Sequence, residues 1–320
     1  MNRRKREKEK LKQQIARQAQ PLQQPARPAL DHGFYNASVV TVPDFKLAQI
    51  VLVGCGGIGA YMAQHIGRIM RVLYSDEKGI NLTLCDPDIV EEKNLGRQLF
   101  CDAEIGQPKA VALARRYGQA WALNTTAYHG EYREELLLGT AELIVLVGCV
   151  DNAAARRVLA DTLMNNPQNP GPHAPPKIWW LDCGNLKDTG RTMLGSASSE
   201  EQMRGAFLDG KKCISLPSPT LQYPSLLIPQ PEELDGAEMS CAEMAAANLQ
   251  SLNINAAVAV QAADMLTRLL VTRDLKRYQC AVNVAAGSVK SFYCTPEQVA
   301  EEIERPVSFV DGTQAHDVAA

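Results

Sequence analysis

A glycine-rich turn after the first strongly apolar segment constrains the fold of this chain more than any other feature. Residues 50–53 have the composition of a buried strand, residues 54–59 carry the spacing G-x-G-x-x-G, and residues 57–73 have the pattern of a helix. In a strand–turn–helix unit, such glycines permit a tight turn, a close approach to a phosphate, and close packing of helix on strand. The helix N-terminus also offers free N–H groups to an anion. The turn therefore predicts a nucleotide-binding site formed by Gly54, Gly56, Gly57 and Gly59.

Apolar strands alternate with helices over the first half of the folded part. Strands are expected at residues 50–53, 80–85, 143–147 and 178–181, and helices at residues 57–73, 109–119 and 153–165. This alternation predicts an α/β fold with a Rossmann-like, mostly parallel sheet and helices on both of its faces. Later strands are expected at 191–196, 213–216, 278–285 and 289–294, with a proline-dotted loop at 217–233 and a long helix at 241–271. We expect this C-terminal half to extend the sheet in an antiparallel or mixed arrangement.

The chain is expected to fall into four segments. These are a disordered basic arm at 1–33, a nucleotide-binding half at 34–184, the C-terminal half of the same domain at 185–294, and a last helix and tail at 295–320. The first 30 residues contain nine Lys or Arg and two Glu, a net charge of +7; the whole chain carries −3, which leaves −10 for the remainder. Such an arm can contact nucleic acid or an acidic partner, but a solvated tail is the expectation, and no nucleic-acid partner is expected.

The composition also indicates a compartment. No apolar run in the sequence suggests a membrane span, and the charged N-terminus lacks the apolar stretch of a secretory signal. The nine cysteines are scattered, with no C-x-x-C pair, which is typical of free thiols in a reducing environment. We therefore expect a cytoplasmic protein that does not enter a membrane.

Charged and amide side chains follow the second expected strand. Asp86 ends that strand, where a carboxylate can accept hydrogen bonds from a ribose hydroxyl, and up to this point NAD and ATP both remain open. Within two dozen residues the chain then places Asp88, Asn94, Arg97, Gln98 and Lys109. Arg and Lys neutralise a triphosphate, whereas a dehydrogenase would have no task for them. The cluster therefore favours ATP, although a solvated loop of mixed charge is the alternative.

Asp151 and Asn152 follow the third expected strand. The carboxyl ends of neighbouring parallel strands face one crevice, so Asp86 and Asp151 should share a rim, with Arg97 and Lys109 reaching in from the loop between them. A carboxylate opposite two cations on a triphosphate suits Mg²⁺. Asp151 is therefore the predicted magnesium ligand.

Four motifs in sequence order carry a family resemblance. They are the glycine turn, then Asp86-x-Asp88-x-Val90-x-x-x-Asn94-Leu95-x-Arg97-Gln98, then Gly106-Gln107-Pro108-Lys109-Ala110, then Asp151-Asn152-x-x-x-Arg156. Over residues 34–294 the chain resembles the ThiF/MoeB/HesA family, the relatives of ubiquitin-activating enzymes. The proline- and asparagine-rich insert at 166–176 and the C-terminal half are most similar to the members found in the plasmid-borne PRTRC system.

The resemblance implies an activity and a partner. Members of this family use Mg·ATP to adenylate the C-terminal glycine of a β-grasp protein, either a ubiquitin-like modifier or a sulfur carrier, and they are usually homodimers. By this resemblance Asp86 holds the ribose, Arg97 and Lys109 stabilise the phosphates, Asp151 binds Mg²⁺, and Gln98 lies beside Arg97 at the nucleotide. Because a carboxylate is already nucleophilic, catalysis would come from positioning and from charge stabilisation at the α-phosphate.

The sequence departs from the family in three places. Residues 28–48 contain no arginine, whereas relatives carry an arginine element before the first strand. The two C-x-x-C pairs that hold structural zinc in many relatives are absent, so no zinc is expected. Cys241 opens the long helix near the position of the cysteine that accepts the activated carrier; a transfer nucleophile and a buried helix-start cysteine remain equally open.

Three functions therefore remain in contention. The first is an adenylating enzyme that activates a β-grasp protein and then transfers it to Cys241 or releases it as the adenylate. The second is a non-catalytic nucleotide-binding or scaffold member of the same family, favoured by the missing arginine element. The third is an NAD-dependent oxidoreductase, which leaves Arg97, Gln98 and Lys109 without a task.

Overall fold

The computed structural model describes residues 31–74, 78–168, 174–208, 210–229 and 253–313. The chain divides into two units, Met1–Tyr35 and Asn36–Ala320. Of the first unit, residues 31–35 are described, and they include all but the last residue of the short helix α2 (His32–Asn36). Residues 32 and 33, expected in the disordered arm, are therefore helical. Residues 1–30 of that arm, the start of the helix at 241–271 with Cys241, and the end of the C-terminal tail lie outside the described residues.

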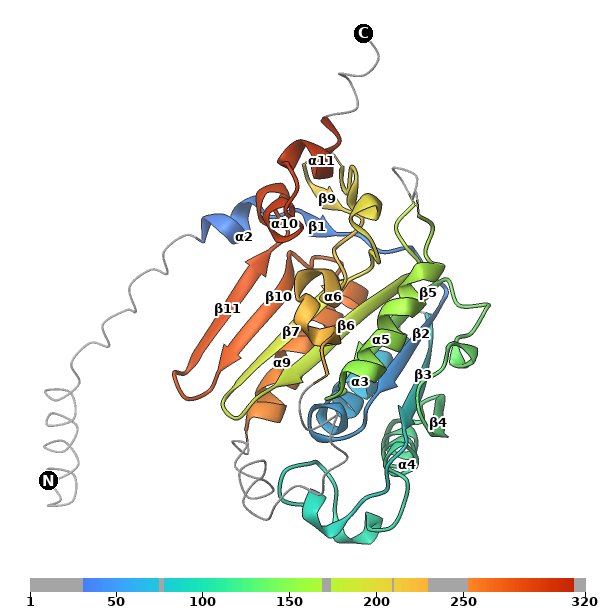
Figure 1. Cartoon of the computed structure of the whole chain (residues 1–320). Coiled ribbons are helices and arrows are strands. Elements are labelled where there is room, and N and C mark those ends of the chain that lie inside the picture. Colours follow the sequence, from blue (N-terminus) through green and yellow to red (C-terminus); the bar gives the residue numbers. More distant parts are fainter. Residues whose placement is uncertain (1–30, 75–77, 169–173, 209, 230–252, 314–320) are drawn as a thin grey trace, which may run out of the picture. The chain divides into compact units, whose positions relative to one another are not determined.

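An eight-stranded sheet forms the centre of the second unit, with strand order β11-β10-β7-β6-β5-β2-β3-β4 (Figure 1). The five parallel strands are β2 (Leu47–Val53), β3 (Gly79–Asp86), β4 (Thr125–His129), β5 (Leu143–Gly148) and β6 (Ile178–Asn185). Antiparallel pairing then adds β7 (Thr189–Gly195), β10 (Arg277–Asn283) and β11 (Ser288–Tyr293). The predicted α/β class, with a mostly parallel sheet that an antiparallel half extends, is confirmed.

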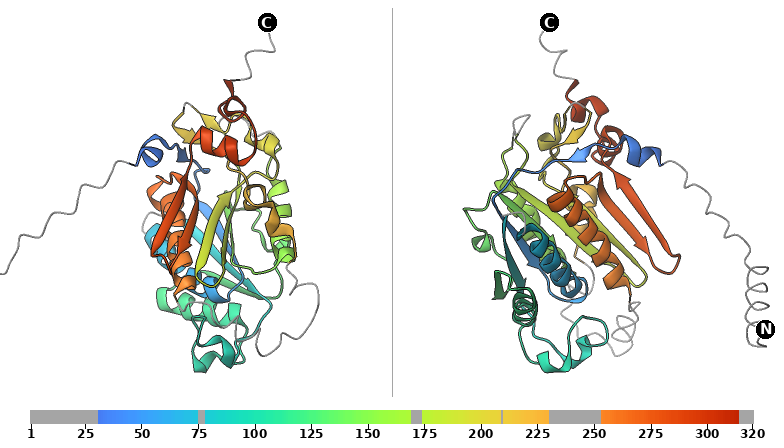
Figure 2. Two further views of the ribbon diagram at one scale, coloured as in Figure 1. Left: turned by 60° about the vertical axis from the view of Figure 1, so that its left-hand side comes forward. Right: turned by 180° about the vertical axis from the view of Figure 1, so that it is seen from behind.

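Helices cover both faces of this sheet (Figures 1 and 2). One face carries α3 (Gly57–Tyr74), α4 (Lys109–Trp121) and α9 (Ile254–Thr267), and the other carries α5 (Ala153–Thr162), α6 (Pro219–Gln222) and the 3-10 turn η6 (Pro224–Leu227). The alternation of β2 explains the two layers, because Ile50 and Leu52 pack into the cluster on the α3 side while Val51 and Val53 pack with Leu159 of α5. Trp179 and Trp180 of β6 are fully buried.

Shorter elements complete the described chain. A separate three-stranded sheet has the order β1-β9-β8, from β1 (Val39–Val40), β9 (Lys212–Cys213) and β8 (Phe207–Leu208). The C-terminal helices are α10 (Pro296–Glu302) and α11 (Val307–Asp311), and the other 3-10 turns are Glu92–Asn94, Asp102–Glu104, Glu134–Leu136, Leu163–Asn165 and Glu200–Met203. Thr295 caps α10 by accepting a hydrogen bond from the Gln298 N–H (3.2 Å).

Several sequence expectations differ from the structure. The strand expected at 213–216 is reduced to the two residues of β9, because the segment after it turns to pair with Ala197. The expected irregular loop at 217–233 contains α6, whose start is fixed by Ser218 accepting the Leu221 N–H (3.2 Å). Strand β4 was not predicted, because its residues TTAYH are half-exposed at the sheet edge and carry no apolar run.

The expectation that no segment could cross a membrane also needs correction. Among the described residues one helix, Ile254–Thr272, is long and apolar enough to do so by length and composition. It comprises α9 and a π-helical turn (Arg268–Thr272). About 56% of it is buried inside the molecule, where it packs on α3, β6 and β7. A core helix satisfies the same test, so this is weak evidence for a membrane span.

Gly195, at the end of β7, allows the segment at Pro217 and Ser218 to pass close over the sheet. A Cβ atom at Gly195 would lie 1.9 Å from the Pro217 carbonyl oxygen, a conflict with backbone rather than with a flexible side chain. The crossing is held by Gln222 Nε2, which donates to the carbonyls of Leu194 (3.0 Å) and Pro217 (2.7 Å). This close approach places α6 and η6 over β7.

We expect Gly195→Ala to lower the free energy of unfolding by about 1–3 kcal/mol, the usual cost of overpacking. Gly139→Ala is the matched control, since a Cβ at Gly139 has no atom within 4 Å, and it should change stability by less than about 0.5 kcal/mol. Urea unfolding followed by circular dichroism measures both. Equal stabilities of the two variants would contradict the close approach.

Candidate nucleotide-binding pocket

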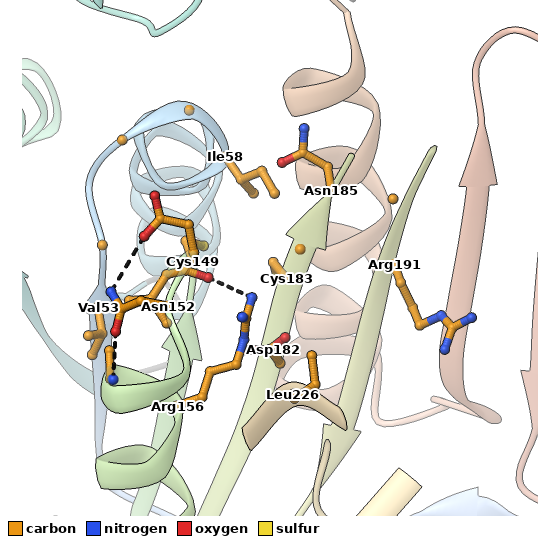
Figure 3. Close-up of a pocket in the computed structure, with 18 of the residues that line it drawn as sticks. Val53, Ile58, Cys149, Asn152, Arg156, Asp182, Cys183, Asn185, Arg191 and Leu226 are labelled. Atoms are coloured by element: carbon orange, nitrogen blue, oxygen red, sulfur yellow. Dashed lines mark hydrogen bonds and ion pairs between the residues drawn. The ribbon is translucent and has the colours of Figure 1, made fainter. Parts of the chain in front are cut away.

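A pocket of about 1160 Å³ opens at the carboxyl ends of the parallel strands. Its lining begins at the glycine turn and the ends of β3 and β5, continues past β6, and reaches β7, β10 and β11 (Figure 3). This position is where open α/β sheets bind their ligands. The pocket is large enough for a nucleotide together with part of a second molecule.

The glycine turn needs glycine at two positions for different reasons. Gly54 has a φ of +87°, and a Cβ there would lie 2.5 Å from the Cys149 carbonyl oxygen. A Cβ at Gly59 would lie 1.9 Å from the Gly54 carbonyl oxygen. Side chains at either position would therefore push the turn away from β5 or from α3. The turn and the helix N-terminus remain open to the pocket at Gly56 and Gly57.

Asp86 is buried and links two loops. Its Oδ2 accepts the Cys55 N–H (2.6 Å) and its Oδ1 accepts the Asp88 N–H (2.8 Å). Burial raises the pKa of the Asp86 carboxyl, and the two backbone N–H groups oppose this shift by favouring the charged form. Each carboxylate oxygen keeps a second lone pair, so the group can still accept a hydrogen bond from a ligand hydroxyl.

Two cations approach the pocket from the segment after β3. Lys109 begins α4, is buried, and forms an ion pair with Asp88 (Nζ to Oδ2, 2.8 Å). Arg97 Nε and Gln98 Oε1 are buried polar atoms without a hydrogen-bond partner among the described residues, and both side chains line the pocket. Buried polar atoms without partners are uncommon in folded proteins, which suggests that a ligand completes them.

Asn255 at the start of α9 supports this loop. Its Nδ2 donates to the Arg97 carbonyl (3.1 Å), and a Cβ at Gly57 would lie 2.7 Å from its Oδ1. Asn248, Asn253 and Asn255 interrupt the otherwise apolar sequence of this segment. The structure places Asn255 at the pocket, while Asn248 lies outside the described residues.

Asp151 and Asn152 lie at the end of β5. Asp151 is exposed, and its Oδ1 is 3.4 Å from Asn152 Nδ2. Asn152 is the N-cap of α5, since its Oδ1 accepts the Ala155 N–H (2.8 Å). Its side chain therefore fixes the start of α5 next to Asp151.

Most of the predicted site residues line this one pocket, namely Gly54, Gly56, Gly57, Asp86, Asp88, Arg97, Gln98, Lys109, Asp151 and Asn152. Gly59 and Asn94 are not among the lining residues. Gly59 packs below the turn, and Asn94 is buried, with its Oδ1 accepting the Glu91 N–H (2.8 Å). Cys241 lies outside the described residues.

A buried ion pair at the pocket was not predicted (Figure 3). Arg156 Nε lies 3.3 Å from Asp182 Oδ1, and Arg156 Nη2 donates to the Val150 carbonyl (2.6 Å), next to Asp151. Asp182 is 1% exposed, and its Oδ2 has no partner among the described residues. Burial raises the pKa of the Asp182 carboxyl, and Arg156 opposes that shift. Asp182 follows an apolar strand as Asp86 does, so the same signal could have identified it.

Other lining residues were missed because their strand was missed. Gly130, Glu131 and Tyr132 follow β4 and line the pocket beyond Asp86. The thiols of Cys149 and Cys183 also line it. Burial raises the pKa of the Cys55 thiol, and the pKa of Cys149 is raised by a hydrogen bond with Cys183 and by burial. Cys55 and Cys183 are both buried.

Comparison with known proteins finds a family match over part of the chain. Residues 40–177 match the model of the ThiF family. The chain carries a ThiF family domain. Human ubiquitin-like modifier-activating enzyme 6 is 44% identical over 67 residues, 21% of this chain and 6% of that protein. The adenylyltransferase and sulfurtransferase MOCS3 of Danio rerio is 32% identical over 120 residues, 35% of this chain and 24% of that protein.

The ThiF family domain also has a structural neighbour. The crystal structure of selenomethionine PaaA superposes with a TM-score of 0.50 at 13% identity, covering 78% of this chain and 65% of that chain. At this identity the likeness shows the fold alone. The matched segments span a quarter or less of the two curated relatives, so this chain resembles only a part of each.

We expect Arg156→Leu to destabilise the protein by about 3–5 kcal/mol at neutral pH, because it leaves the Asp182 carboxylate buried and unpaired. Burial places the pKa of the Asp182 carboxyl in the folded protein above its unfolded value, which is near 3.8. The free energy of unfolding therefore falls as pH rises from the unfolded pKa to the folded pKa. The loss should therefore be small near pH 4 and full near pH 7 in urea unfolding experiments.

Two further variants complete this test. Arg156→Leu with Asp182→Asn should recover much of the stability at pH 7, since the buried charge is gone. Arg204→Leu, which breaks an exposed pair with Glu201, is the control and should show no comparable pH dependence. A pH-independent loss in Arg156→Leu would mean that packing, not the Asp182 charge, is what Arg156 provides.

Proposed function

We propose that this protein uses ATP to adenylate the C-terminal carboxylate of a carrier polypeptide, with release of pyrophosphate. One observation carries the proposal: Lys109, Arg97 and Gln98 converge on the same pocket as an open glycine turn, and two of them bring buried polar atoms that lack partners. A nicotinamide cofactor would leave these groups unused. The names of the relatives, an activating enzyme and an adenylyltransferase, support the same chemistry.

In the proposed reaction a carboxylate oxygen of the carrier attacks the α-phosphorus of ATP. A new oxygen–phosphorus bond forms as the bond to the bridging oxygen of pyrophosphate breaks, so the products are an acyl adenylate and pyrophosphate. No proton moves, so no general base is required. Arg97, Lys109 and the N–H groups of the glycine turn would stabilise the charge that shifts to the phosphates, and Asp86 would hold the ribose.

Magnesium would accompany the nucleotide. Among the described residues, no group of three or more His, Cys, Asp or Glu is arranged to hold a metal ion. Mg²⁺ is usually held by one or two carboxylates together with substrate phosphates, and the exposed Asp151 carboxylate at the pocket suits that mode. When bound, the ion would neutralise phosphate charge. Zinc is not part of the proposal.

Three further residues would support the nucleotide site by holding the segments that carry its charged side chains. Asn94 caps the short turn before Arg97, Asp88 pairs with Lys109, and Asn152 fixes the start of α5 beside Asp151. Asn94 and Asn152 would therefore affect the nucleotide chiefly by holding neighbouring side chains. Asp88 would exchange its ion pair with Lys109 for the incoming phosphates.

The carrier that we propose is a β-grasp protein with a C-terminal glycine, either ubiquitin-like or a sulfur carrier. We further propose a cytoplasmic homodimer that does not bind nucleic acid, as the family resemblance suggests; the subgroup of the PRTRC system stays a prediction. Transfer of the activated carrier to Cys241 is the proposed second step. If the missing arginine element between residues 28 and 48 abolishes catalysis, the protein would bind ATP without adenylating a carrier.

ATP–pyrophosphate exchange, with and without a β-grasp protein that ends in glycine, tests the first step. We expect exchange that depends on the carrier and falls at least about 100-fold in Arg97→Ala and in Lys109→Ala, because each removes a charge at the phosphates. Lys93→Ala is the matched control, since Lys93 is exposed, pairs with Glu91 and does not line the pocket. ATP binding without exchange would favour the non-catalytic alternative, and NAD binding in place of ATP would refute adenylation.

Intact mass analysis with carrier and ATP tests the second step. We expect a covalent adduct that disappears in Cys241→Ser while ATP–pyrophosphate exchange persists, because exchange needs only the adenylate. An adduct that survives the substitution would assign transfer to another thiol. Exchange without any adduct would indicate an enzyme that releases the adenylate to a later acceptor.

A further inference from the structure

The pocket carries charges of both signs at its proposed nucleotide end, where Arg97, Lys109 and Arg156 lie among carboxylates, and only positive charges at its other end. Its acidic lining residues among those described all lie at or near the carboxyl ends of β3, β4, β5 and β6, namely Asp86, Asp88, Glu131, Asp151 and Asp182. Beyond Asp182 the charged lining residues are Arg191 on β7 and Lys290 on β11. The proposed function uses the first end for ATP, which leaves the cationic end without a ligand.

Strand register places the two cations in one row. Arg191 pairs with Ala281 of β10, and Ala281 pairs with Lys290 of β11. Directly opposed residues of antiparallel strands point to the same face, so both side chains flank the small Ala281. Two further rows on this face flank the row of cations. One consists of Thr189, Asn283 and Ser288, and the second of Met193, Gln279 and Phe292. Neither row contains a carboxylate.

The face of this row is the one away from α9. Thr192, next to Arg191, contacts Met265 of α9 (3.2 Å from Oγ1 to Sδ), so Arg191 points to the opposite side. There its guanidinium lies 4.7 Å from the centre of the Tyr223 ring, and Lys290 lies 4.8 Å from the Phe292 ring. Figure 3 shows Arg191 extending from β7 away from Asp182.

Within the described residues Arg191 and Lys290 make no ion pair. The Arg191 charge also acts on Glu302 of α10: burial raises the pKa of the Glu302 carboxyl, and the hydrogen bond with Tyr278 and the Arg191 charge oppose that shift. The two cations are therefore available to a ligand that enters over the sheet.

The register also sets the reach of such a ligand. Val53 before the glycine turn pairs with Gly148, Gly148 pairs with Asp182, and Gly184, two residues further on, pairs with Arg191. With strands about 4.8 Å apart and about 3.3 Å per residue, Arg191 lies roughly 16 Å and Lys290 roughly 25 Å from the end of β2. An extended chain of about 3.4 Å per residue covers these spans with about five and seven residues.

We propose that this face binds the stretch just before the C-terminus of the carrier, and that Arg191 and Lys290 select acidic side chains about four to seven residues from its terminal carboxylate. The inference rests on the proposed function, which places that carboxylate at the nucleotide. Arg191 and Lys290 act as specificity-determining residues, remote from the reacting atoms. A basic tail would meet two like charges here, and a neutral tail would leave them unpaired.

Fluorescence anisotropy with the full chain and labelled ten-residue peptides ending in Gly-Gly tests this directly. One peptide carries Glu at the fifth and seventh positions from its end, a second carries Gln there, and a third carries Lys. We expect the Glu peptide to bind about five- to tenfold tighter than the Gln peptide at low salt, and this preference to shrink at high salt. The Lys peptide should bind most weakly.

Variants assign the preference to the two cations. Arg191→Gln with Lys290→Gln should reduce it to less than about twofold, and Arg191→Glu with Lys290→Glu should reverse it in favour of the Lys peptide, a gain that misfolding cannot produce. Lys187→Gln, an exposed cation on the β6–β7 turn that does not line the pocket, is the matched control and should leave it unchanged.

Equal affinity for the Glu and Gln peptides, or a preference that survives the double Gln variant, would overturn the proposal. Peptide binding that weakens as protein concentration rises would also overturn it, because a second copy of the chain would then cover the face. If ATP–pyrophosphate exchange occurs but the peptides bind without a charge preference, only the role of Arg191 and Lys290 is refuted. If the Glu peptide is preferred but no ATP–pyrophosphate exchange occurs, only the proposed adenylation is refuted.

Discussion

The buried carboxylate of Asp86 joins the two loops that form the proposed nucleotide end of the pocket. It accepts one backbone N–H from Cys55 in the glycine turn and one from Asp88 in the following loop. A buried charge is tolerated only where hydrogen bonds compensate it, so these two bonds both stabilise the carboxylate and fix the loops. Asp88 in turn pairs with Lys109, which places that cation at the rim.

A single sheet connects this end of the pocket to the cationic end. The parallel strands end at the nucleotide side, and β7, β10 and β11 continue the same sheet with antiparallel pairing. Gly195 lets the chain cross β7 closely enough for η6 to wall the pocket. The fold thus holds two chemically different surfaces in fixed relation, because hydrogen-bonded strands keep a constant spacing.

Some of this site could be predicted from local sequence signals. The glycine spacing, the apolar run before it and Asp86 at the next strand end lie within one strand–turn–helix–strand unit, where short-range order decides the geometry. Lys109 and Asp151 could be placed because parallel strands end at one edge. Strand β4 could not, since it is a half-exposed edge strand whose residues TTAYH carry neither an apolar run nor an alternation.

By itself, the sequence determined the α/β class, the glycine turn between strand and helix, and the identity of the charged residues near it, because these depend on periodicity and on residues close together in the chain. Only the tertiary structure decided that Asp182 pairs with Arg156 and that the Asn255 side chain packs against Gly57. It also decided that Arg191 and Lys290 lie in one row across the sheet. Each of these depends on strand register or helix packing between segments far apart in sequence. A shift of one residue in register would send a side chain to the other face, and nothing local in the sequence fixes that choice.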